Sequence, residues 1–212
     1  MKGLLLNNFY AMLSNLKLTL GISAVLTLVP IFIREDSFVS TIIGVQIFLF
    51  AVYTGTFLQA DESSKWGKFA ITLPVKRRTI IHAKYVSSIL LIAVGLIIST
   101  PTAVLSSILI GDINPDSIVF GYCFGLTLSF STVAFMYPIL LKIGAEKHEL
   151  VLILACGFSV GIMLLVSLIL SLFKDGINFR SSIVGITSVV VSVLLLVLSY
   201  FISVRMHGSK EY

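Results

Sequence analysis

Hydrophobic residues run in six long blocks along the chain, and short polar stretches separate the blocks. A helix needs about 20 mostly apolar residues to cross the roughly 30 Å hydrocarbon core of a bilayer. The blocks are continuous, whereas the strands of a membrane barrel alternate in pieces of about ten residues. The pattern therefore predicts six transmembrane helices, over residues 16–33, 38–60, 83–110, 118–141, 150–173 and 183–204.

The segment before the first block has a polar side and an apolar side. On a helical wheel of residues 1–15, Leu5, Phe9 and Met12 share one arc, and asparagine and serine residues face away from it. Such a helix suits the membrane interface, where its apolar side enters the lipid and its polar side stays in water. We therefore expect an N-terminal interfacial helix; the alternative is a polar extension of the first span.

A charged stretch, ADESSKWGKFAITLPVKRR, lies between the second and third blocks and contains the only tryptophan of the chain. A helix over residues 61–73 would carry aromatic and apolar side chains on one side and lysines on the other. Asp61 is the expected N-cap, because capping and acidic groups stabilise the first turn. Pro74 ends the helix, because proline excludes the preceding residue from the helical region. Membrane anchoring alone would explain the basic VKRR run, but the amphipathic helix before it favours a docking element.

The composition is typical of a membrane protein with short loops. Hydrophobic residues make up 57% of the 212 residues, charged residues make up 12%, and the mean hydropathy is +1.06. A soluble domain carries about 25% charged residues, so this chain could not cover a surface that faces water. We predict an all-α integral membrane protein whose residues 1–212 form a single transmembrane domain, with six transmembrane helices, an N-terminal interfacial helix and a cytoplasmic helix over 61–73.

The distribution of basic residues predicts the orientation. An even number of spans puts both termini on one side of the membrane. With the termini inside, twelve of the fifteen lysines and arginines lie in cytoplasmic segments or at cytoplasmic span ends. Cytoplasmic loops are enriched in these residues. We therefore predict a multi-pass protein of the plasma membrane with both termini in the cytoplasm.

The interiors of the predicted spans contain no Asp, Glu, Lys or Arg. Charges inside a membrane mark proton relays, ion paths and coupled transporters, so their absence argues against an ion-coupled transporter. His82, His148 and His207 have no metal-chelating spacing, and no metal site is expected. The chain also lacks the GxxxxGK[ST] motif that cradles nucleotide phosphates. The sequence thus predicts no enzyme activity, no cofactor in this chain and no nucleic-acid partner.

Polar and small residues within the spans have structural as well as functional interpretations. The second span holds candidates for lining a transport pathway, although hydrogen bonds between helices are the commoner use of such residues: Gln46, Tyr53, Thr54 and Thr56. Two pairs of glycines four residues apart should let helices approach closely: Gly121 with Gly125, and Gly157 with Gly161. Pro101 and Pro138 should kink their helices, with the hydroxyls of Ser99, Thr100 and Thr102 near enough to Pro101 to satisfy freed carbonyls.

The sharpest motif is the stretch DESSKWGKFAITLPVKRRTIIHAKY. Its acidic start, tryptophan, LP pair and basic pair leading to KY resemble the loop after the second span in the type-2 permeases of ATP-binding-cassette exporters, especially the small bacterial members. The opening MKGLLLNNFY is also similar to the start of these permeases. The predicted architecture resembles theirs over nearly the whole chain.

This resemblance implies a permease subunit that has no ATPase of its own and pairs with a second permease, identical or different, around a translocation path. Each permease would dock a cytoplasmic ATP-binding-cassette ATPase, which binds ATP and Mg. In the family the helix after the second span is the coupling helix, which fits into a cleft of the ATPase. The resemblance carries this docking role to Asp61, Glu62, Trp66, Phe69, Leu73, Pro74, Arg77 and Arg78, and the helical wheel adds Lys65 and Lys68.

Within the family, the size and the loop are most similar to the exporters of amphipathic phenol-soluble-modulin peptides. Export of amphipathic peptides or similar hydrophobic cargo is therefore expected. The outer loop between the fifth and sixth spans is shorter than in larger members, which argues against polysaccharide or large-lipid export. The residues alone leave a different class open, a non-transporting immunity or scaffold protein whose cytoplasmic loop binds a soluble regulator.

Overall fold

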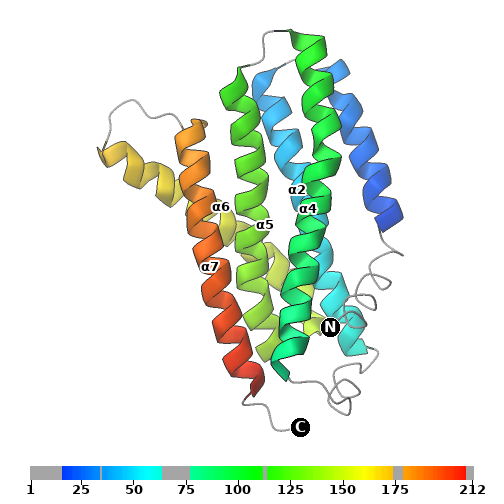
Figure 1. Ribbon diagram of the computed structural model, residues 1–212, viewed down its shortest axis with the longest axis vertical. Coiled ribbons are helices and arrows are strands. Elements are labelled where there is room, and N and C mark those ends of the chain that lie inside the picture. The colour runs from blue at the N-terminus through cyan, green and yellow to red at the C-terminus, as the bar shows by residue number, and fades with distance from the viewer. Residues whose placement is uncertain (1–15, 34, 64–76, 112–113, 174–178, 209–212) are drawn as a thin grey trace.

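The computed structural model describes residues 16–33, 35–63, 77–111, 114–173 and 179–208, and these are helical apart from short turns. An apolar helix over Leu16–Ile31 comes first and ends in the 3-10 turn η1 (Val29–Ile31). A second 3-10 turn, η2 (Ala145–Lys147), leads into α6. The long helices of Figure 1 are α2 (Asp36–Ser63), α4 (Arg77–Ile110), α5 (Pro115–Ile143), α6 (His148–Phe173) and α7 (Ser182–Gly208).

Five of the described helices are long and apolar enough to cross a membrane. They correspond to the second to sixth predicted spans, and the chain is a multi-pass, all-α membrane protein. The first predicted span, residues 16–33, is represented by the shorter helix Leu16–Ile31. At 1.5 Å per residue this helix is about 24 Å long, less than the hydrocarbon core, so a sixth crossing stays a prediction. The predicted interfacial helix over 1–15 lies outside the described residues.

Two predicted boundaries around the charged stretch differ from the structure. Asp61 was expected to cap a new helix, and this prediction is wrong, because α2 continues through Asp61 to Ser63. The sequence between Phe57 and Ser63 contains no proline or glycine that would stop the helix. At the other side, α4 begins at Arg77, six residues before the predicted span start at 83. The expected helix over 61–73 lies outside the described residues from position 64 onward.

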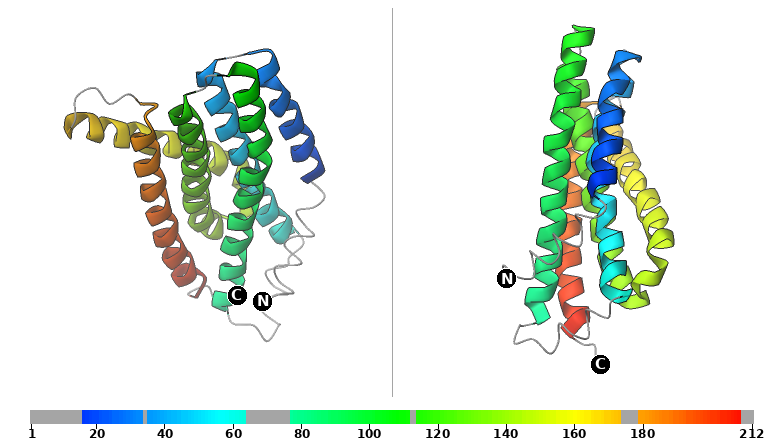
Figure 2. Two further views of the ribbon diagram at one scale, coloured as in Figure 1. Left: turned by 45° about the horizontal axis from the view of Figure 1, so that its top comes forward. Right: turned by 90° about the vertical axis from the view of Figure 1, so that its right-hand side faces the viewer.

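Helix α5 occupies the centre of the molecule. It packs most extensively against α7 on one side and α2 on the other, and α4 lies along α2. Figures 1 and 2 show α6 leaning away from this bundle, so that its C-terminal end stands apart from α5. The ends of α2, α5 and α7 and the starts of α4 and α6 gather at one end of the molecule, which we call the lower end after its position in Figure 1.

Glycines allow α2 and α5 to touch along their backbones. A Cβ atom on Gly121 would stand 2.7 Å from the carbonyl oxygen of Ser40, and one on Gly125 would stand 2.8 Å from the Cα atom of Gly44. Lipid tails are as apolar as leucine side chains, so close contact of this kind, rather than water exclusion, holds membrane helices together. By contrast, no atom of the described chain lies within 4 Å of the Cβ position at Gly157 or Gly161.

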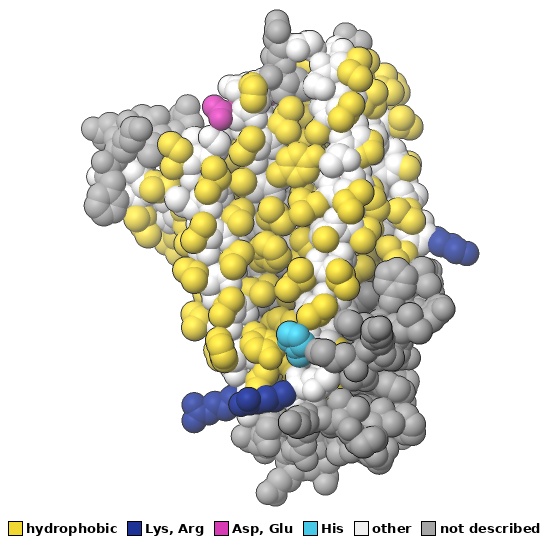
Figure 3. All heavy atoms as spheres, viewed as in Figure 1, with side chains coloured by type: hydrophobic (Ala, Val, Ile, Leu, Met, Phe, Trp, Pro, Cys, Tyr) yellow, Lys and Arg dark blue, Asp and Glu magenta, His cyan; other side chains and the backbone are white. Residues whose placement is uncertain are grey.

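The interior beside this contact is filled by fully buried side chains from three helices. Ile43, Ile47 and Phe50 come from α2, Ile92 comes from α4, and Met136 comes from α5. Leucine, isoleucine and valine side chains cover the outer faces of α6 and α7 instead. Most of the side chains that Figure 3 colours by type are hydrophobic, and the Lys and Arg side chains lie low and at the right-hand margin of the described surface. Such a surface fits lipid or another membrane-embedded subunit.

Hydroxyl groups donate hydrogen bonds to the backbone carbonyls near Pro101 in α4. A proline has no N–H, so the carbonyl of Ile97, four residues earlier, loses its helical partner. Thr100 donates to that carbonyl at 2.7 Å, as the sequence predicted for this neighbourhood. Ser99 donates to Leu96 at 2.9 Å, whereas Thr102 is used differently and donates its hydroxyl to Gln46.

Adding a methyl group at the contact between α2 and α5 should destabilise the fold. In Gly125→Ala the new Cβ would overlap the backbone of Gly44, and overpacking of this kind costs about 1–3 kcal/mol. The matched control is Gly157→Ala, where the methyl meets no described atom and alanine is the better helix former by about 1 kcal/mol. Thermal unfolding in mild detergent should show a lower midpoint for Gly125→Ala only. Equal midpoints for the two variants would contradict the contact.

Candidate functional site

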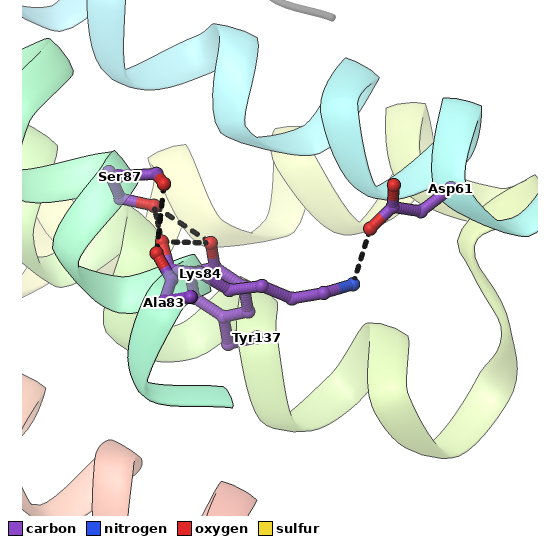
Figure 4. Close-up of polar contacts among 6 residues, drawn as sticks. Asp61, Ala83, Lys84, Ser87 and Tyr137 are labelled. Atoms are coloured by element: carbon purple, nitrogen blue, oxygen red, sulfur yellow. Dashed lines mark hydrogen bonds and ion pairs between the residues drawn. The ribbon is translucent and has the colours of Figure 1, made fainter. Parts of the chain in front are cut away.

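A buried ion pair joins the end of α2 to the start of α4 at the lower end of the bundle. The Nζ atom of Lys84 lies 2.7 Å from the Oδ2 atom of Asp61, and the two side chains are only 14% and 11% exposed. Figure 4 shows the lysine side chain reaching from α4 across to α2. The pair connects Asp61, at the start of the charged stretch that the sequence singles out, with Lys84, six residues beyond the end of that stretch.

The backbone of the same lysine is held by α5. Tyr137 donates its hydroxyl to the carbonyl oxygen of Lys84 at 3.0 Å. Ser88, one turn further along α4, lies 2.8 Å from the Tyr137 hydroxyl and also donates to the Lys84 carbonyl at 3.1 Å. Tyr137 is fully buried, so these bonds supply the partners that its hydroxyl needs away from water. The ion pair is thereby connected to the central helix.

Stacked tyrosines extend this connection to α7. The rings of Tyr85 and Tyr137 stack with their centroids 4.4 Å apart. The Tyr85 hydroxyl lies 2.8 Å from the Ser199 hydroxyl and 2.9 Å from that of Ser203, one turn further along α7. Tyr200 packs edge-on against Tyr85. Polar contacts and ring contacts therefore hold α4, α5 and α7 together next to Lys84, at the lower end of the bundle.

Pro138 explains why Ser199 has a second contact in this cluster. Proline leaves the carbonyl of Ala134, four residues earlier in α5, without its helical donor. Ser199 donates its hydroxyl to that carbonyl from α7. A carbonyl that the helix cannot satisfy internally is thus satisfied by the neighbouring helix, as the low dielectric of the membrane interior requires. The proline creates an attachment point for α7.

The cluster holds the ends of neighbouring helices in fixed positions. Its members are one ion pair, tyrosines and serines, and no group of metal-binding side chains occurs in the described part of the chain. Removing water strengthens the attraction between the charges of Asp61 and Lys84. Burying each of these two charges costs free energy, however, and this cost offsets the attraction. Such a pair adds little net stability when complete and is costly when broken. This behaviour suits a joint that fixes two helix ends.

The predicted docking residues fall partly into this region. Asp61 lies in the last turn of α2, where its carboxylate faces Lys84 inside the chain. Glu62 lies in the same turn, Arg77 begins α4, and the side chain of Arg78 is exposed. The docking role of these four residues stays a prediction. The remaining predicted residues lie outside the described residues: Lys65, Trp66, Lys68, Phe69, Leu73 and Pro74.

The predicted pathway residues of α2 have different environments. Gln46 is fully buried and bridges helices: its amide nitrogen donates to the Ser23 carbonyl at 3.0 Å, and its amide oxygen accepts from Thr102 at 2.8 Å. These contacts favour the interpretation of Gln46 as a hydrogen-bonding residue between helices. Thr54 is buried, and its hydroxyl has no hydrogen-bond partner in the described chain. Tyr53 and Thr56 are partly exposed, so a pathway role at these positions stays a prediction.

Sequence reasoning missed Lys84, Tyr137 and Ser199 as members of one cluster. A weak signal for the ion pair exists, because an acid follows one apolar block and a base precedes the interior of the next. Antiparallel neighbours bring such ends together, so a pair at this position could have been proposed. Nothing in the local sequence connects Tyr137 or Ser199 to Lys84, which are 53 and 115 residues away.

The fold and the site define a multi-pass helical membrane protein whose described part is tied together at one end. A comparison with protein families gives its class: the family described as ABC-2 family transporter protein matches residues 3–207. The chain therefore belongs to this family and is a permease subunit of an ABC transporter. The ATPase activity of such transporters resides in separate subunits, so an ABC ATPase is its partner. Searches of curated proteins and of solved structures returned no significant match.

Neutralising one member of the ion pair should destabilise the fold. Asp61→Asn and Lys84→Met each leave a buried charge without its counter-charge, which costs about 3–5 kcal/mol for buried pairs. The free energy of unfolding, measured in mild detergent, should fall by that order in both variants. Lys142→Met removes an exposed charge near the end of α5 and should change it by less than about 0.5 kcal/mol. Similar losses in all three variants would show that the pair has no special role.

Proposed function

We propose that this permease exports amphipathic peptides or similar hydrophobic cargo, driven by ATP that its partner ATPase binds and hydrolyses. It pairs with a second permease subunit, identical or different, and the cargo passes between them. The ATPase docks on the stretch between α2 and α4. Membership of the ABC-2 family supports the permease role, and the arrangement of charge along the chain supports the orientation in the membrane, the docking stretch and the class of cargo.

The position of the basic residues supports a cytoplasmic lower end. Arg78 lies in the first turn of α4, Lys142 lies in the last turn of α5, Lys147 ends η2, and Arg205 lies near the end of α7. All four side chains are exposed at the lower end. The positive-inside rule assigns such an end to the cytoplasm, where the ATPase resides. The charged stretch is then accessible to the ATPase.

The observation that carries the cargo proposal is the uncharged interior of the described spans. Residues 85–110, 117–141, 150–173 and 183–204 contain no Asp, Glu, Lys or Arg. A path between such helices offers hydroxyls, aromatic rings and apolar side chains, and it has no fixed charge with which to bind an ion. Hydrophobic or amphipathic molecules match these walls. The energy for transport must come from outside the chain, which the ATPase supplies.

Changing the charged stretch should weaken binding of the ATPase without unfolding the permease. In Trp66→Ala an aromatic anchor is lost, and in the double variant Lys65→Glu with Lys68→Glu the charge of the polar side is reversed. Losing one interface anchor costs about 2 kcal/mol or more, a decrease of roughly thirtyfold in affinity. The measurement is co-purification of the ATPase with each permease variant, with helicity and unfolding temperature as folding checks.

The matched control reverses two lysines outside the stretch at the same end of the bundle. Lys142→Glu with Lys147→Glu changes the net charge by the same amount, and both side chains are exposed. This variant should retain the ATPase. If the folded Trp66 and Lys65/Lys68 variants retain the ATPase to the same extent as the control, the docking proposal is wrong.

Amphipathic helical peptides should stimulate ATP hydrolysis by the reconstituted complex, because occupancy of an apolar path favours the conformation that closes the ATPase. The complex is placed in liposomes and the ATPase rate is measured with increasing peptide. We expect at least a severalfold rise, which corresponds to roughly 1–3 kcal/mol of coupling between the two sites. A scrambled peptide of equal composition and low helical amphipathicity is the control. Stimulation and transport of small hydrophilic solutes alone would exclude this class of cargo.

A further inference from the structure

We propose that Asp61, Lys84 and Tyr137 form a transmission clamp, which makes the two ends of the ATPase-docking stretch move as one body with α5. The clamp consists of the ion pair between α2 and α4 and the hydrogen bond from Tyr137 to the Lys84 carbonyl. This inference rests on the proposed docking function of the stretch between α2 and α4. It adds positioning residues that lie inside the permease.

The clamp joins the two points at which force from the docking stretch enters the membrane domain. One point is the last turn of α2, which ends at Ser63, and the other is the first two turns of α4, which begin at Arg77. Without a bond between them, these two helix ends could separate or slide when the stretch is displaced. A 2.7 Å ion pair sets their separation directly.

The connection continues from Lys84 into the centre of the bundle. Tyr137 of α5 holds the Lys84 carbonyl and also meets Ser88, so its contacts span a full turn of α4. Its ring stacks on Tyr85, whose hydroxyl contacts two serines of α7. Figure 4 shows Lys84 of α4 with its side chain directed at Asp61 of α2 and its backbone beside Tyr137 of α5. A shift of the α2 and α4 ends is therefore passed to α5, which contacts α2, α6 and α7.

The burial of the clamp separates its role from docking. Both charged side chains are more than four-fifths buried, so they offer little surface to a partner protein. Buried ion pairs give little net stability compared with apolar side chains, but their geometry is specific. We infer that the pair positions the docking stretch, whereas Trp66 and its neighbours bind the ATPase. The two roles predict different effects of mutation.

The test uses the complete complex of permease and ATPase in liposomes, with a synthetic amphipathic helical peptide as the probe. Three quantities are measured: ATPase retained on purification, ATP hydrolysis with and without peptide, and peptide transported per ATP hydrolysed. We expect Lys84→Met, which lies outside the predicted docking residues, to retain the ATPase and its basal rate, and Asp61→Asn is compared for coupling only. Peptide stimulation and transport per ATP should each fall at least about fivefold, the lower end of typical coupling between sites.

Two further variants keep the test decisive where a single neutralisation prevents folding. Tyr137→Phe keeps the ring stack and the ion pair, removes the bonds to Lys84 and Ser88, and should lower transport per ATP while leaving ATPase binding unchanged. The charge-swapped double variant Asp61→Lys with Lys84→Asp restores an ion pair and should recover at least half of the lost coupling. Glu149→Gln and Lys142→Met, which neutralise exposed charges at the same end, are the controls.

The outcomes separate this inference from the proposed function. If the wild-type permease binds no ATPase, or if the complex does not respond to the peptide, the proposed function is wrong. The clamp inference is then wrong as well, because it rests on that function. If the wild type responds and the folded Asp61, Lys84 and Tyr137 variants transport as much peptide per ATP as it does, the clamp alone is overturned. Loss of the ATPase itself from the Lys84→Met or Tyr137→Phe variant would also overturn it, because these residues would then belong to the docking site.

Discussion

The structure depends on one constraint: inside a bilayer, every polar group must find its partner within the protein, because lipid offers none. This constraint explains the long uninterrupted helices and the use of most hydroxyls in the described chain. Thr100 satisfies a carbonyl next to Pro101, and Ser199 reaches from α7 to one that Pro138 leaves free in α5. Gln46 uses both ends of its amide to join the first described helix, α2 and α4. Contacts that would be incidental in water thus determine which helices stay together.

The same constraint makes α5 the central element. Close backbone contact through Gly121 and Gly125 brings it against α2, and polar contacts through Ala134 and Tyr137 bring it against α7 and α4. Helix α6 has fewer such contacts within the chain and leans outward, with Gly157 and Gly161 on open surface. The contacts between helices are therefore concentrated around α5, and the apolar faces of α6 and α7 are left for lipid or another subunit.

An ABC permease must receive work from an ATPase that is a separate subunit, so some part of it has to be both accessible and firmly attached to the spans. In this chain the ends of α2 and α4 flank the charged stretch and are joined by Asp61 and Lys84. Because both side chains are buried, separating the two helix ends would leave two buried charges without partners, which costs free energy. A membrane domain with uncharged spans thus keeps its one described buried ion pair at the junction between the bundle and the stretch that we assign to docking.

The sequence by itself determined the class of fold, five of the spans and their approximate limits, because apolar length is a local property that lipid selects directly. It also determined the charged stretch and the family resemblance, since both depend on residues that are adjacent in the sequence. It misplaced the end of α2, because an aspartate after an apolar block is typical of a helix cap. In the structure, Asp61 continues α2 and its carboxylate pairs with Lys84 of α4. Only the tertiary structure decided that Asp61, Lys84, Tyr137 and Ser199 form one cluster, and that Gly125 lies against a helix while Gly157 does not. The physical reason is that these outcomes depend on how helices rotate and tilt against each other, which spacing along one helix does not specify.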